Sequence, residues 1–278
     1  MDACTKKQLT AAAIKIRRAV IEGTFAAKSG HPGGSLSIAD TLAYLYFKEM
    51  NVDPENPKWA GRDRFVLSKG HAAPALYGAL ALKGFFPWDE IHSLRHTGAM
   101  LQGHPDMKGT PGVDISTGSL GQGVSCAAGM ALAGKLDGAA YRVYAILGDG
   151  EIQEGQVWET AMFAAAKGLD NLCIVVDNNN LQIDGTVEKV NSPYPIPEKF
   201  AAFGWNVVVI DGHDFDQIEA AFANARETKG KPTAIIQTSV KGKGVSFMEN
   251  QVGWHGKGPG KDEHDTALAE LDAALAAL

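Results

Sequence analysis

The sequence predicts an α/β fold with a parallel β-sheet and helices on both of its faces. Four short apolar runs bounded by glycine or polar residues are read as buried strands: 141–147, 172–176, 207–210 and 234–238. Stretches with helical character lie between them, near 156–167 and 215–229. Strands that alternate with helices are typical of crossover units, which build parallel sheets. We expect one domain over residues 1–278.

The N-terminal part is expected to be helical. Apolar residues recur at helical spacing before a glycine-rich turn, at Leu9, Ala13, Ile16 and Val20. This spacing predicts a helix from residue 7 to about 28, and the turn covers 29–34. A second helix over about 38–48 follows, for which Ser37 is a suitable N-cap. A further strand-like run follows Arg64.

The C-terminal part combines loops with a final helix. A proline-rich stretch over 192–197 predicts a rigid loop. The glycine-rich segment 241–261 is read either as an ordered ligand loop or as a flexible tail. Residues 266–278 are rich in alanine and leucine and predict one helix.

Composition restricts the class of protein. The net charge of −6 and the lack of a Lys/Arg run argue against nucleic acid as a partner. Cys4, Cys126 and Cys173 are far apart and form no C-x-x-C pair, so neither a disulfide framework nor a zinc site is indicated. No apolar stretch reaches the roughly 20 residues that span a bilayer. We expect a soluble, cytoplasmic protein.

Two polar segments directly follow predicted strands. Asp149 lies between two glycines after the strand 141–147, and the run 177–180 (DNNN) follows the strand 172–176. In parallel sheets, ligands bind at the edge formed by the carboxyl ends of the strands. A carboxylate, an amide oxygen and a main-chain carbonyl form a hard oxygen set that suits Mg²⁺ or Ca²⁺. Either segment alone is also an ordinary turn, but Asp149 and Asn179 lie 30 residues apart, the length of one strand–helix–strand unit.

In this arrangement, GDG followed by NN resembles the thiamine diphosphate fingerprint of the transketolase family. Further motifs occur in the order known for that family along nearly the whole chain: SGHP (29–32), SKGHA (68–72), QGHP (102–105), STGSLGQG (116–123) and WHG (254–256). The resemblance implies a thiamine-diphosphate-binding fold, specifically the domain that holds the diphosphate, with Mg²⁺ or Ca²⁺ as the cation.

The resemblance also implies a set of site residues. The implied cation ligands are Asp149, Asn179 and the main-chain oxygen of Leu181. The implied cofactor contacts are His71, Gly118, Ser119, Leu120, Asp149, Gly150, Glu154, Asn179, Lys241 and His255. The implied catalytic residues are His31, His71, His104, His255 and Glu154. Among them, His31 and His255 would exchange protons with the ketose, and Glu154 corresponds to a buried glutamate at the dimer contact of the family.

The histidines can also be weighed without the resemblance. Five of the eight have a glycine next to them: His31, His71, His104, His213 and His255. As a set they suit polyhydroxylated, phosphorylated substrates, since imidazole donates, accepts and transfers protons near neutral pH. Each one alone is equally well explained by a structural hydrogen bond. A zinc hydrolase is the alternative, but no H-E-x-x-H is present, and we assign His92 and His96 to a solvated helix face.

The resemblance covers only the first part of a transketolase. The second domain of the family supplies the glutamate that activates the pyrimidine ring, and Glu151, Glu154 and Glu159 all belong to the diphosphate side. We therefore expect the chain to need a partner subunit that carries the pyrimidine-side and C-terminal domains, in a heterotetramer. The final helix favours a naturally split enzyme. Gly34 departs from relatives that have a side chain there, which leaves the fine substrate contacts open.

The predicted activity is transfer of a two-carbon ketol unit from a ketose phosphate to an aldose phosphate. One alternative is the same reaction on a sulfonated or branched ketose. Deoxyxylulose-phosphate synthase fits less well, because the QEG and WHG segments resemble transketolase. A third alternative is a non-catalytic module that binds thiamine diphosphate and regulates another protein. A purely structural protein leaves the glycine and histidine motifs unexplained.

Overall fold

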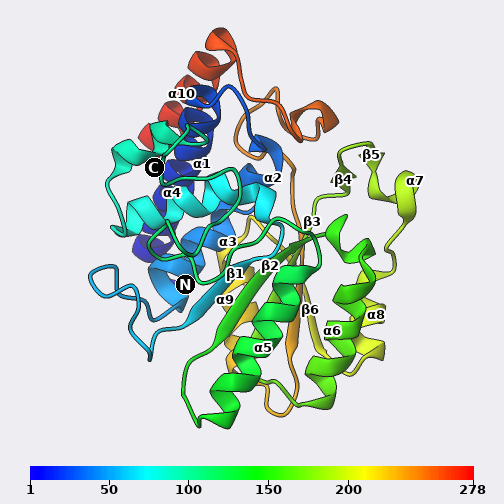
Figure 1. The fold of residues 1–278 in the computed structure, drawn as a ribbon. Coiled ribbons are helices and arrows are strands. Elements are labelled where there is room, and N and C mark those ends of the chain that lie inside the picture. Colours follow the sequence, from blue (N-terminus) through cyan, green and yellow to red (C-terminus); the bar gives the residue numbers. More distant parts are fainter.

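The computed structural model describes all 278 residues and has a five-stranded parallel sheet at its centre (Figure 1). The strands are β1 (Arg64–Leu67), β2 (Val143–Gly148), β3 (Leu172–Asn178), β6 (Asn206–Asp211) and β7 (Thr233–Thr238). They lie in the order β1-β2-β3-β7-β6, and every pairing is parallel. The predicted fold class is confirmed, and the four predicted strands have bounds within two residues of those observed.

Helices cover both faces of the sheet, as Figure 1 shows. One face packs against α1 (Ala3–Ala26), α3 (Ala39–Tyr44), α4 (Ala73–Lys83), α9 (Phe215–Glu227) and α10 (Lys261–Ala276). The other packs against α5 (Gln122–Leu136), α6 (Gly155–Ala166) and α8 (Ile196–Ala202). In β2, Tyr144 and Ile146 belong to the first core, while Ala145 and Leu147 belong to the second. Because both faces are buried, the inner strands consist mainly of apolar residues, and polar side chains such as Asp177 occur near their carboxyl ends.

Shorter elements surround the carboxyl ends of the strands. They are α2 (Pro32–Leu36), the hairpin strands β4 (Leu181–Gln182) and β5 (Gly185–Thr186), and α7 (Val187–Asn191). Short 3₁₀ turns cover Gly70–Ala72, Trp88–Ser93, Glu151–Gln153 and Val252–Trp254, and a π-helical turn, Leu45–Glu49, follows α3. No helix combines the length and the apolar composition that crossing a bilayer requires.

The prediction that Ser37 caps a helix is wrong. The residue before α3 is Ile38, and the hydroxyl of Ser37 instead donates to Oδ2 of Asp177 at 2.6 Å. The helix begins one residue later than predicted, and its start has no side-chain cap. The assignment of His92 and His96 to one helix face is also wrong, because only a 3₁₀ turn ending at Ser93 forms there.

Two predicted C-terminal features have shifted bounds. The final helix, α10, begins at Lys261, where the side chain of Glu263 accepts a hydrogen bond from the amide of Gly260 at 2.7 Å. The proline-rich stretch is not a loop to its end, since α8 begins at Ile196. The glycine-rich segment after Lys241 buries Val245 and Met248 in the core, which favours the ligand-loop interpretation over a tail.

Candidate functional site

A cleft of about 720 Å³, including its open mouth, lies at the carboxyl ends of β2 and β3. Nine of the predicted residues line it: His71, Leu120, Asp149, Gly150, Glu154, Asn179, Leu181, Lys241 and His255. The segments that follow separate strands are brought together here because parallel strands end at the same edge of the sheet.

Asp149 is buried without a cationic partner in contact. The residue is only 2% exposed, and its side chain accepts backbone hydrogen bonds from Gly150 at 2.8 Å and Asn180 at 2.5 Å. Burial, and next the charge of Asp177, raise the pKa of Asp149 to about 7. A bound cation would remove this penalty, since a buried carboxylate is stable when it is paired or coordinated.

Asn179 and Leu181 bring further oxygen atoms to the same place. Oδ1 of Asn179 accepts a hydrogen bond from the amide of Leu181 at 3.1 Å, which leaves one lone pair on that oxygen. The main-chain oxygen of Leu181 accepts from Nζ of Lys241 at 2.8 Å, so this oxygen already faces a positive group. No three His, Cys, Asp or Glu side chains converge anywhere to hold a metal ion. The oxygen set with one carboxylate fits a hard cation that keeps water and phosphate ligands.

Lys241 and His255 form a positive side of the cleft. Nζ of Lys241 lies 2.8 Å from Nδ1 of His255. Burial, and next the charge of Lys241, lower the pKa of His255 to about 3, so the ring is neutral near pH 7. Nδ1 therefore accepts the hydrogen bond from the lysine and the proton of the ring is on Nε2. Burial, and next the charge of Lys69, lower the pKa of Lys241 to about 8.

Three of the predicted histidines lie close together. The ring centroids of His31 and His71 are 5.2 Å apart, those of His71 and His255 5.2 Å, and those of His31 and His255 5.6 Å. Burial, followed by the charge of Arg95, lowers the pKa of His31 to about 4. Burial and the charge of Lys69 lower the pKa of His71 well below its usual value. Neutral rings that both donate and accept suit a sugar with several hydroxyl groups.

His104, Gly118 and Ser119 lie beside the cleft without lining it. His104 is exposed, and its ring lies about 3.1 Å from where a Cβ on Gly118 would be. Gly118 has φ +148°, a conformation that favours glycine. Ser119 is exposed in the same turn. Glu154 lines the cleft but is an exposed residue in this chain.

Four residues that organise the site were not predicted as site residues from the sequence: Lys69, Arg95, Glu151 and Asp177. Arg95 donates to Oγ of Ser29 at 3.0 Å, and its Nη2 lies 3.5 Å from Nδ1 of His31. Glu151 is buried and accepts from the amides of Gly121 and Gly148, both at 3.0 Å, which joins the turn before α5 to the end of β2. The only signal in the sequence was charge inside otherwise apolar or glycine-rich motifs.

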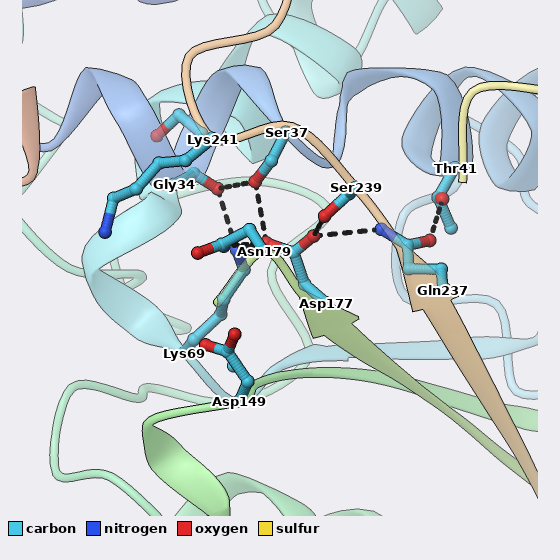
Figure 2. Close-up of polar contacts among 12 residues, drawn as sticks. Gly34, Ser37, Thr41, Lys69, Asp149, Asp177, Asn179, Gln237, Ser239 and Lys241 are labelled. Carbon is cyan, nitrogen blue, oxygen red and sulfur yellow. Dashed lines mark hydrogen bonds and ion pairs between the residues drawn. The ribbon is translucent and has the colours of Figure 1, made fainter. Parts of the chain in front are cut away.

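Lys69 and Asp177 form a buried ion pair beneath the cleft, as Figure 2 shows. Nζ of Lys69 lies 2.6 Å from Oδ2 of Asp177 and donates to the main-chain oxygen of Gly34 at 2.7 Å. Asp177 lies at the end of β3. The pair therefore connects the loop after β1, helix α2 and the end of β3.

Adjacent glycines in α2 should respond differently to alanine. A Cβ on Gly33 would lie 2.9 Å from the main-chain oxygen of Trp254 and 3.1 Å from Cγ of Lys241, whereas on Gly34 it would lie 3.6 Å from His71. We expect Gly33→Ala to lower the free energy of unfolding by about 1–3 kcal/mol through overpacking. Gly34→Ala should change it by less than about 0.5 kcal/mol. Urea unfolding of both variants tests this, and equal losses would contradict the close approach.

Comparison with known proteins gives a consistent result. Residues 8–272 match the family model described as "Transketolase, thiamine diphosphate binding domain". The chain is 48% identical over 257 residues to the 6-deoxy-6-sulfo-D-fructose transketolase subunit SqwG of Clostridium sp. (strain MSTE9), with 92% of this chain and 94% of that protein covered. It is 41% identical over 261 residues to an apulose-4-phosphate transketolase subunit of Phocaeicola vulgatus, covering 94% and 92%.

A solved transketolase structure has a similar fold. Transketolase from Leishmania mexicana superimposes with a TM-score of 0.90 at 31% identity. The match covers 95% of this chain and 41% of that one.

Proposed function

The chain belongs to the transketolase family, and from this premise we propose that it is the subunit that holds the diphosphate and the cation of thiamine diphosphate in a two-chain transketolase. The observation that carries the proposal is the cleft in which Asp149, Asn179 and the Leu181 oxygen face Lys241 and His255. Oxygen ligands on one side and positive or neutral donors on the other match a cation–diphosphate pair.

Within this cleft each group has a chemical task. Asp149, Asn179 and Leu181 would hold Mg²⁺ or Ca²⁺ through oxygen, and His71 and Lys241 would contact the phosphate oxygens. When bound, thiamine diphosphate would supply the stabilised carbanion that cleavage of a carbon–carbon bond next to a ketone requires.

Two histidines would act on the sugar. Nε2 of neutral His255 carries a proton and can donate to the ketose carbonyl oxygen as negative charge develops on it. His31 is also neutral, and its ring centroid lies 5.6 Å from that of His255. Because Nδ1 of His31 faces Nη2 of Arg95, which can only donate, the ring proton is on Nε2, from which it can be donated to an oxygen of the substrate. Burial, and next the charge of Arg95, keep this ring neutral, and Arg95 also faces its Nδ1.

The reaction we propose moves a two-carbon ketol unit from a ketose phosphate to an aldose phosphate. The alternative donor is a sulfonated ketose, which is favoured by the 48% identity to a subunit named for 6-deoxy-6-sulfo-D-fructose. A branched ketose is a further alternative donor, because another relative is named for apulose 4-phosphate.

A partner subunit would complete the site. Glu151 is buried and its carboxylate is engaged by Ser68 and two backbone amides, so it is not free to act on the pyrimidine ring. We propose that the partner chain supplies the activating glutamate, in a heterotetramer with two chains of each kind.

The three free cysteines, Cys4, Cys126 and Cys173, support a reducing compartment such as the cytoplasm.

A ketol-transfer assay tests the proposal. The chain would be assayed alone and together with the separately encoded chain that carries the remaining domains, with thiamine diphosphate and Mg²⁺. Xylulose 5-phosphate and 6-deoxy-6-sulfofructose would be compared as donors, with ribose 5-phosphate as one of the acceptors. Activity only in the mixture supports the two-chain enzyme, and the preferred donor selects the sugar. Cofactor binding without turnover on any donor would favour the regulatory module, and activity of the chain alone would contradict the partner's role.

In the active mixture, His255→Ala should lower kcat by about 10²–10⁴-fold, the range for loss of a proton-transfer group. His96→Ala, a change at an exposed residue outside the cleft, is the matched control and should leave kcat unchanged. Thiamine diphosphate affinity would be measured for both, because His255 also contacts Lys241. Unchanged turnover in the His255 variant would rule out the proposed role.

A further inference from the structure

Asp177 is a fully buried carboxylate that the proposed chemistry does not use. It is 0% exposed and accepts hydrogen bonds from five side chains, drawn in Figure 2: Ser37 Oγ (2.6 Å), Lys69 Nζ (2.6 Å), Asn179 Nδ2 (2.9 Å), Gln237 Nε2 (3.1 Å) and Ser239 Oγ. A carboxylate offers about four lone-pair directions. Asp177 is therefore saturated by the protein and can affect a ligand only through its neighbours.

The donors to Asp177 come from different segments of the cleft. Lys69 precedes His71 by two residues, and Ser239 precedes Lys241 by two residues. Ser37 directly follows α2, the helix that contains Gly33 and Gly34. One carboxylate thus joins the segments that place the diphosphate-side histidine, the buried lysine and the cation ligand.

The contact with Asn179 also determines which way its amide points. A carboxylate with five donors can only accept, so the group of Asn179 that faces it must be Nδ2. The amide oxygen is then turned to the side of Leu181, whose amide donates to it at 3.1 Å. That is the side on which the main-chain oxygen of Leu181 lines the cleft. Asp177, which only accepts, and the Leu181 amide, which only donates, thus select the same orientation of the Asn179 amide from its two sides.

The charge of Asp177 is stable in this environment. Burial by itself would raise the pKa of Asp177, but the charge of Lys69 and the hydrogen bonds from Lys69, Ser239 and Ser37 lower it below its usual range. Gln237 is held in turn by the hydroxyl of Thr41, which donates to its Oε1 at 2.5 Å. The network therefore extends from α3 to the end of β3 (Figure 2).

We propose that Asp177 is a positioning residue, which holds the segments of Ser37, Lys69 and Ser239 together and turns the amide oxygen of Asn179 toward the cation. The part that concerns the cation rests on the proposed function. The part that concerns the segments rests on the hydrogen bonds alone.

Three variants of the full chain test the proposal. Asp177→Asn removes the charge and the purely accepting character of the residue, and Ser239→Ala removes one donor while the ion pair with Lys69 stays. Thr41→Val is the matched control, because it deletes a buried hydroxyl of the same network that does not touch Asp177. Urea unfolding would first establish the stability of each variant, since Asp177→Asn could fail to fold and Ser239→Ala would then decide.

The first measurement is hydrogen–deuterium exchange of the chain without cofactor. In Asp177→Asn, peptides that cover 34–37, 68–71 and 239–241 should exchange faster than in the wild type. In Ser239→Ala, only the peptide over 239–241 should do so. Unchanged exchange of these peptides in both variants would overturn the positioning of the segments.

The second measurement is Mn²⁺ binding to the chain in the presence of thiamine diphosphate. Asp177→Asn should weaken Mn²⁺ binding by about 10–100-fold, as losses of outer-shell partners do. Ser239→Ala should weaken it by a smaller factor, because Asp177 keeps its charge and its contact with Asn179. Thr41→Val should leave the Mn²⁺ affinity unchanged even if it unfolds at lower urea. An Mn²⁺ affinity equal to that of the wild type in all three variants would overturn the role of Asp177 toward the cation. A wild-type chain that binds no Mn²⁺ would contradict the proposed function of the isolated chain, and exchange would then decide the positioning separately.

Discussion

Replacing Asp149 by alanine is expected to abolish cation-dependent binding of thiamine diphosphate, with at least a roughly 100-fold loss of affinity. Loss of an outer-shell partner already costs about 10–100-fold, and Asp149 is the only carboxylate in the proposed ligand set. Binding would be followed by calorimetry with Mg²⁺ present and again with EDTA. Asp184→Ala, an exposed aspartate close in sequence, is the control and should bind as the wild type does.

Although Asp149→Ala should bind the cofactor more weakly, it should gain stability relative to the wild type when no cation is present. In EDTA the wild type must bury an uncompensated carboxylate whose pKa is raised to about 7 from the usual 3.8. A raised pKa in an acid means that the folded state binds the proton more tightly than the unfolded state. The wild type should therefore lose stability relative to Asp149→Ala as the pH rises from about 4 to about 7, and no further above it. A stability difference that is independent of pH would contradict the buried charge.

The second large effect concerns the ion pair between Lys69 and Asp177. Lys69→Met leaves the carboxylate of Asp177 buried without its cation, and we expect a loss of about 3–5 kcal/mol in the free energy of unfolding. Asp177→Asn leaves the ammonium group of Lys69 equally unpaired. The double variant should lose less than the sum of the two single changes, by about 1–3 kcal/mol, because each partner is costly mainly when the other remains.

Urea unfolding of the wild type, both single variants and the double variant measures this coupling. Lys135→Met is a suitable comparison, since its ion pair with Asp170 at 2.8 Å is partly exposed to solvent. That change should cost less than about 1 kcal/mol. Additive losses at Lys69 and Asp177 would mean that the two groups do not interact as the structure has them.

The architecture was predictable because it depends on local patterns. The strands β2, β3 and β7 are buried on both faces, so they appear in the sequence as continuous apolar runs. Asp149 and Asn179 follow two of these runs, and the geometry of parallel sheets then places them at one edge. Errors arose where apolar periodicity was weak, as at Ser37 and at the 3₁₀ turn around His92.

The sequence by itself therefore determined the fold class and the edge of the sheet at which Asp149 and Asn179 lie together. Only the tertiary structure decided how these residues are held. Lys69 meets Asp177 across 108 positions of the chain, and Ser37 meets it across 140. No local propensity or spacing encodes such a contact, because a side chain's partner depends on which segments the packed sheet brings together. The sequence alone therefore does not identify Lys69 as the partner of the buried Asp177 carboxylate.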